Sequence, residues 1–126
     1  MKKRVPNLER CKRLKEAGYP QEKSKFYWVT DHADVAWVEY SQSEFYNSFD
    51  IIAAAPIVTE LVEECLILMR ASAKWGERIR LVRMNDGNWY AEPFYHDGIP
   101  LCDVRVADTL PNALTDLWME LKGEKA

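Results

Sequence analysis

The sequence predicts an α+β domain with three helices and a mainly antiparallel sheet of about five strands, in the order α-β-β-α-β-β-β-α. Segments in which apolar residues recur every three or four positions, typical of helices, alternate with short aromatic and β-branched runs, typical of strands. Turn sequences join neighbouring strands, which indicates antiparallel hairpins. Helices are then expected to cover one face of the sheet.

The chain starts with a basic tail, residues 1–6, and a short helix. Asn7 is a favourable N-cap, and Gly18 is a typical stop. The helix has one apolar side, formed by Leu8, Cys11, Leu14 and Ala17. Residues 1–16 hold seven Lys or Arg and two Glu, although the net charge of the 126-residue chain is -3. We expect these charges to be solvated, with single-stranded nucleic-acid binding as the alternative.

A hairpin and a second helix follow. Strands are predicted at 25–30 and 35–40, and a polar loop with embedded aromatics runs from 41 to 49. A short apolar run at 50–55 precedes Pro56, which opens a helix of about four turns.

Three strands and a last helix complete the prediction. Strands at 77–84 and 89–95 are joined by an Asp-Gly turn, and another strand covers 101–106. Pro93 predicts a sheet edge or a bulge. The helix over 107–122 is capped by Thr109 and stopped by Gly123. Its apolar stripe consists of Leu110, Ala113, Leu114, Leu117, Trp118 and Leu121.

Composition indicates one folded domain, 1–126, because 48% of the residues are apolar and five Trp and six Tyr are present. No apolar run approaches the ~20 residues of a membrane span, and the N-terminus lacks the apolar core of a signal peptide. We therefore expect a cytoplasmic protein without a membrane partner. The three cysteines, Cys11, Cys65 and Cys102, are too widely spaced for a zinc or redox motif and are expected to be buried.

No group of residues in the sequence has the spacing of a known catalytic motif. The sequence lacks a nucleophile-elbow motif, a phosphate-binding loop and a dinucleotide fingerprint. His32 and His96 have aspartates nearby and could converge on a metal, but both lie in predicted turns, where Asp and Gly are expected for backbone reasons. We expect a non-enzymatic protein with no metal and no cofactor.

Aromatic and arginine side chains form the best-founded candidate site. Arg78, Arg80 and Arg83 lie on one predicted strand, opposite Trp89 and Tyr90 on the next. With Trp28 and Tyr46 they could offer stacking rings beside guanidinium groups, which suits a nucleotide or a protein partner. The alternative is that the rings pack the core while the arginines form the wet side of the sheet.

Three segments, Leu14–Gln21 (LKEAGYPQ), Ile52–Pro56 followed by Glu60-Leu61, and Asp108–Trp118 (DTLPNALTDLW), resemble small uncharacterised proteins carried by phages and prophages. The resemblance implies an intracellular, virus-associated setting. It transfers no catalytic residue, because its motifs are helix starts and stops.

Residues 78–121 are similar to the HicB-type antitoxin module, through a strand, an Asp-Gly turn, a second strand and the Asp108-Thr-Leu-Pro helix start. This resemblance implies a three-stranded antiparallel sheet with one helix, in a family that inhibits a partner toxin. Asn112 stands where that family prefers Glu. Fold-level similarity carries no function by itself.

We therefore expect a phage or prophage accessory protein that acts by binding a host or phage protein. The alternatives are a nucleotide or small-molecule binder that sequesters a signal, and a single-stranded nucleic-acid binder. A homodimer through the sheet edge near Pro93, or through an aromatic patch, is compatible with the same pattern.

Overall fold

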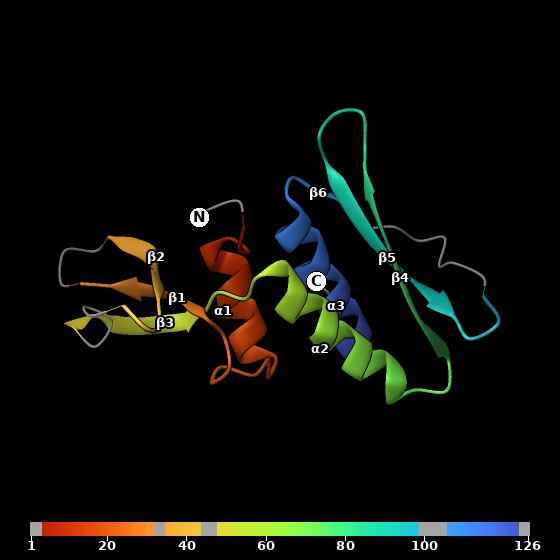
Figure 1. Cartoon of the computed structure of the whole chain (residues 1–126), viewed down its shortest axis with the longest axis horizontal. Coiled ribbons are helices and arrows are strands. Elements are labelled where there is room, and N and C mark those ends of the chain that lie inside the picture. Colours follow the sequence, from red (N-terminus) through yellow and green to blue (C-terminus); the bar gives the residue numbers. More distant parts are fainter. Residues whose placement is uncertain (1–3, 32–34, 44–47, 99–105, 124–126) are drawn as a thin grey trace.

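The structure is a computed structural model that describes residues 4–31, 35–43, 48–98 and 106–123 (Figure 1). The described elements, in chain order, are α1 (Leu8–Glu16), β1 (Phe26–Thr30), β2 (Ala36–Tyr40), β3 (Asp50–Ala54), α2 (Val58–Arg70), β4 (Trp75–Arg83), β5 (Trp89–Tyr95), β6 (Val106–Ala107) and α3 (Leu110–Lys122). The α+β class and the predicted order of elements are confirmed, with one further strand, β3.

The strands form two antiparallel sheets, where the sequence predicts one. Sheet A has the order β2-β1-β3 and sheet B the order β4-β5-β6. The apolar run at 50–55 supplies β3, which pairs with β1 on the side away from β2. After β3 the chain runs through α2 to the other side of the helix layer, where β4 and β5 form the second hairpin. The two predicted hairpins therefore belong to different sheets and do not pair with each other.

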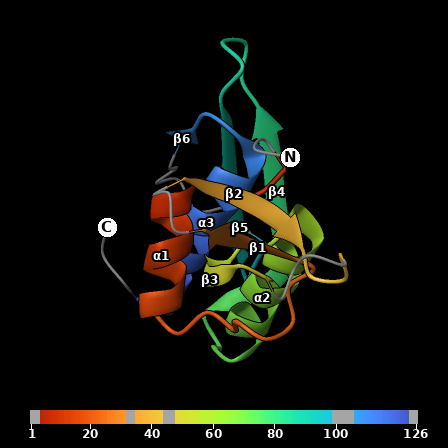
Figure 2. The ribbon, with the colours of Figure 1, turned by 90° about the vertical axis from the view of Figure 1, so that its left-hand side faces the viewer.

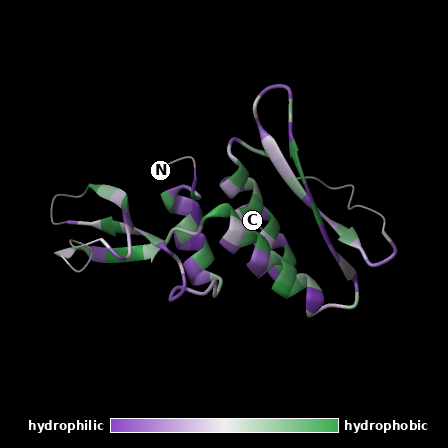
Figure 3. Cartoon of the chain, in the orientation of Figure 1, coloured by the Kyte–Doolittle hydropathy of each residue, from purple (hydrophilic) through white to green (hydrophobic). Residues whose placement is uncertain are grey.

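The molecule is layered, with the helices between the two sheets. Figure 1 shows sheet A, then α1, then α2 and α3, then sheet B. Seen from the sheet A side in Figure 2, the helices lie behind sheet A, and β4 and β5 lie farthest back. Apolar residues run along the strands of sheet A and along α2 and α3, whereas the tip of the β4–β5 hairpin is hydrophilic (Figure 3).

The first helix links both halves because it is apolar on two sides. Cys11 packs with Trp28 and Ala53 of sheet A. Leu14 packs with Leu114 in the cluster that joins α2, α3 and sheet B. Val5 and Pro6, at the end of the predicted basic tail, are also buried, and the Pro6 carbonyl accepts a hydrogen bond from the Trp28 indole at 3.2 Å. The first described residues therefore belong to the packed fold.

The predicted ends of the last helix are confirmed. The Thr109 hydroxyl accepts the Asn112 N–H at 3.3 Å, Pro111 occupies the first turn, and Gly123 ends α3 with a φ of 87°. A left-handed residue at this position favours glycine. The buried side chains of the predicted stripe are Ala113, Leu114, Leu117 and Trp118.

Pro93 lies opposite an irregularity of β4, where the register shifts between Trp75 and Ile79, so the predicted bulge is confirmed. The Pro93 side chain itself is buried. On the side away from β4, the described part of β6 pairs only with Trp89 and Tyr90, so the predicted sheet edge at Pro93 stays a prediction. Homodimerisation near Pro93 or through an aromatic patch therefore also stays a prediction.

Two of the three cysteines fall within the described residues. Cys11 and Cys65 are free thiols and fully buried, as predicted, and Cys102 lies outside the described residues. Burial raises the pKa of the Cys11 thiol to about 12 and also raises that of Cys65. Because the thiolate is the reactive form, both are expected to be inert. Within the described part of the chain, no helix has the length and apolar character needed to cross a bilayer.

Candidate functional site

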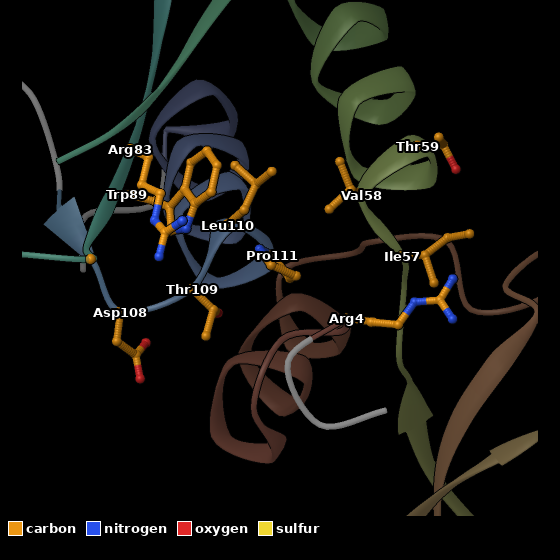
Figure 4. A pocket seen from close by; sticks show the side chains of 11 residues that line it. Arg4, Ile57, Val58, Thr59, Arg83, Trp89, Asp108, Thr109, Leu110 and Pro111 are labelled. Atoms are coloured by element: carbon orange, nitrogen blue, oxygen red, sulfur yellow. The ribbon is translucent and has the colours of Figure 1, made fainter. Parts of the chain in front are cut away.

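A hollow of about 460 Å³ lies where the β4–β5 hairpin meets the starts of α2 and α3. Figure 4 shows Trp89 and Leu110 on one side of this hollow and Ile57 and Val58 on the other, with Pro111 between them. We call it the Arg83 pocket. Its lining residues are Arg4, Ile57, Val58, Thr59, Arg83, Gly87, Trp89, Asp108, Thr109, Leu110 and Pro111. A largely apolar lining with a few polar groups is typical of ligand sites of this size.

The hairpin supplies the central pair of the pocket. Arg83 and Trp89 are direct cross-strand partners at the end of β4 and the start of β5. Trp89 is half-buried and Arg83 is exposed. Arg4 also lines the pocket, and neither arginine has a carboxylate partner among the residues that the structure describes. The pocket thus combines an aromatic face with two uncompensated guanidinium groups.

The start of α2 adds to this positive character. Ile57 holds the N-cap position and has no side-chain oxygen, so the N–H groups of Val58 and Thr59 meet no capping side chain. Glu60 reaches back to the Ile57 N–H at 3.3 Å, but its carboxylate is also held by the Lys25 N–H at 3.2 Å. The start of a helix carries a partial positive charge and favours anions.

Asp108 is the acidic residue of the pocket, and it is engaged by α3. The Asn112 amide donates to its carboxylate at 2.8 Å. This hydrogen bond is the main reason why the pKa of Asp108 is lowered. The Asn112 carbonyl oxygen accepts the Asn7 N–H at 3.0 Å, so this one buried side chain ties the start of α1 to the wall of the pocket.

The other three sheet B residues of the predicted site lie away from the pocket. Arg78 stacks on the Phe94 ring at 4.7 Å, and Arg80 forms an ion pair with the buried Glu92. Tyr90 pairs with Val82 and Val106 within sheet B. Side chains alternate between the two faces of a strand, so Arg80 and Tyr90 lie on the opposite face of the sheet from Arg83 and Trp89.

Of the last two predicted residues, Trp28 and Tyr46, only Trp28 is described. Trp28 is only 7% exposed and packs between sheet A and α1, so its ring is part of the core and offers little surface to a ligand. Its aromatic and β-branched surroundings signal a strand, but not which face of that strand is covered. Tyr46 lies outside the described residues.

The basic side of α1 has structural partners. Arg10 forms a bidentate salt bridge with the Asp116 carboxylate, with N–O distances of 2.9 and 3.0 Å. Lys12 lies 3.7 Å from Glu9, and the Lys15 ammonium donates to the Ile52 carbonyl of β3 at 3.0 Å. These contacts favour a structural role for the basic residues over nucleic-acid binding.

Of the two histidines, only His96 falls within the described residues, and it does not line the pocket. His96 is exposed in the turn after β5, and His32 lies outside the described residues. Across the described ranges, no group of three or more His, Cys, Asp or Glu is placed to hold a metal ion.

Part of the site could have been read from the sequence. Residues two apart on a strand share a face, so Arg83 lies on the same face as Ile79 and Leu81. Arg78 and Arg80 lie on the opposite face. Arg4, Ile57 and Leu110 carry no such signal, because they meet only when two helix starts and the N-terminal segment converge.

The comparisons with known proteins give no relative: no protein-family model, no curated protein sequence and no solved structure matches this chain.

Proposed function

We propose that this protein acts by binding a protein partner and that the Arg83 pocket is the centre of its binding surface. The supporting observation is the pairing of Arg83 with Trp89 beside an open, mainly apolar hollow. Trp and Arg are the residue types that contribute most to protein interfaces, above all where they surround an apolar depression. The proposed setting, a phage or prophage and its host, rests on the sequence resemblance alone.

Site-specific photo-crosslinking in the cells that produce the protein tests this proposal. A photoreactive phenylalanine at Thr59, which lines the pocket and is exposed, is expected to form an adduct with one partner protein. The same group at Lys12, exposed on α1, should not form that adduct. Trp89→Ala should weaken partner affinity about 30-fold, the effect of losing roughly 2 kcal/mol at an aromatic anchor. An adduct that forms equally from both positions, or that survives Trp89→Ala, contradicts the proposal.

A second candidate function is the binding of a small organic anion, such as a nucleotide. It is favoured by two arginines without carboxylate partners in the described residues, beside a helix start whose N-cap residue, Ile57, has no side-chain oxygen. Native mass spectrometry should then show an adduct of a few hundred daltons that disappears in the Arg83→Ala variant and persists in Arg78→Ala. A protein mass without any adduct, also after incubation with a nucleotide panel, rules this function out.

A further inference from the structure

The Arg83 pocket continues along α2. A second hollow of about 410 Å³ is lined by Val58, Thr59, Val62, Glu63, Leu66 and Arg70. Val58 and Thr59 line both hollows, so the two adjoin at the start of α2, and together we call them the α2 groove. Val58, Val62 and Leu66 are four residues apart and share one face of the helix. Leu66 therefore extends the apolar floor about 12 Å beyond Val58.

Sheet B, which supplies Arg83 and Trp89 to the pocket end, carries an open apolar side chain on its inner face. Leu81 is two residues from both Ile79 and Arg83 and shares their face of β4, which the helices cover farther down the strand. Ile79 packs against the core, yet Leu81 is 38% exposed. The hairpin extends past the helices in Figure 1, so the helix layer ends before the sheet does. An apolar side chain left open on the inner face of a sheet marks a surface suited to a further packed element.

The charges are unequal at the two ends of the groove. At the far end, Arg70 is neutralised by Glu77 at 3.0 Å, and Glu63 is exposed. At the pocket end, the lining holds two arginines, Arg4 and Arg83, and one carboxylate, Asp108, which already accepts a hydrogen bond from Asn112. Uncompensated positive charge is thus concentrated at the pocket end of a protein whose net charge is -3. Guanidinium groups bind carboxylates through strong charge-assisted hydrogen bonds.

We propose that the α2 groove binds a short amphipathic segment of a partner protein, with carboxylates at the pocket end and apolar side chains along the rest. The carboxylates pair with Arg4 and Arg83. The apolar side chains pack on Trp89, Val62 and Leu66, as an amphipathic helix packs in a groove. This inference rests on the proposed function and adds the chemistry of the partner segment.

A random library of peptides of about 12 residues tests the inference, since α2 from Val58 to Arg70 spans about 18 Å. Selection on the whole protein is expected to enrich peptides with Asp or Glu beside a cluster of apolar residues. For one synthesised representative, Arg83→Ala should raise Kd about 10- to 100-fold, the loss of a hydrogen bond to a charged group. Leu66→Ala should raise Kd about tenfold. The matched control Arg78→Ala, on the same strand but outside the groove, should leave Kd unchanged.

Three results would overturn the inference, and they separate it from the proposed function. Enriched peptides that lack acidic residues but lose affinity in Trp89→Ala would refute the acidic chemistry and leave the proposed binding surface standing. Peptides that bind equally well to Trp89→Ala and Leu66→Ala would refute both. An unenriched library would refute the short-segment partner, while the crosslinking at Thr59 would still decide the proposed function. Circular dichroism of each variant shows whether the fold is intact.

Discussion

Replacing Trp118 by alanine is expected to lower the free energy of unfolding by about 3–5 kcal/mol, the usual cost of truncating a large buried aromatic. Trp118 is 2% exposed and lies in the cluster where the end of α1, α2, α3 and sheet B meet. Its ring makes an edge-to-face contact with Tyr19 at 5.3 Å, which the variant also loses. A loss of this size is a large share of the stability of an ordinary domain.

Urea denaturation followed by circular dichroism measures this loss. The control is Val35→Ala, because Val35 is 57% exposed and precedes β2. This surface change should move the free energy of unfolding by no more than about 0.5 kcal/mol. Equal stabilities of the two variants would show that the helices and sheet B do not share the described core.

Replacing Asn112 by alanine is expected to cost about 2–4 kcal/mol, since two side-chain hydrogen bonds at a buried position are lost together. Asn112 is 3% exposed, accepts the Asn7 N–H and donates to the Asp108 carboxylate. Alanine offers neither group. The start of α1 should therefore detach from α3 more readily than any change of apolar volume alone would explain.

A second readout of the same variant is the titration of Asp108. The hydrogen bond from Asn112 is the first cause of its lowered pKa, so the pKa should rise toward its usual range in Asn112→Ala. Carboxyl chemical shifts followed by NMR report this directly. In the native protein the lowered pKa contributes stability above the unfolded value of about 3.9, and this is lost as the pH falls through the folded pKa. An unchanged titration would show that Asn112 does not hold Asp108 in solution.

The local structure follows closely from the sequence. The caps Asn7 and Thr109, the stop at Gly123 and the Asp-Gly turn between β4 and β5 all stand where local chemistry favours them. The amphipathic stripe of α3 is buried as its spacing predicts. These features depend on contacts between residues a few positions apart, and such contacts can be read from a single sequence.

The number of sheets could not be predicted from such local contacts. Ala53 and Ala54 are weak strand formers, and they become part of β3 because β1 leaves one edge open beside them. The outer side of β3 is then held by side chains distant in sequence: Gln21 accepts the Ala54 N–H at 2.8 Å, and Lys15 donates to the Ile52 carbonyl. Tertiary contacts override the weak local preference in this segment.

The candidate site shows the same division. The sequence by itself determined that Arg83 lies on a strand opposite Trp89 and Tyr90, because the Asp-Gly turn joins the two strands as a hairpin. The structure decided that its direct cross-strand partner is Trp89, through a loop over residues 85–87. Only the tertiary structure decided that this pair lies beside a pocket. Arg4, Val58 and Leu110 come from three separate parts of the chain, and it is the packing of α1, α2 and α3 between the sheets that gathers them there. Periodicity specifies which side of an element is apolar, whereas the partner that covers that side depends on every other element in the fold.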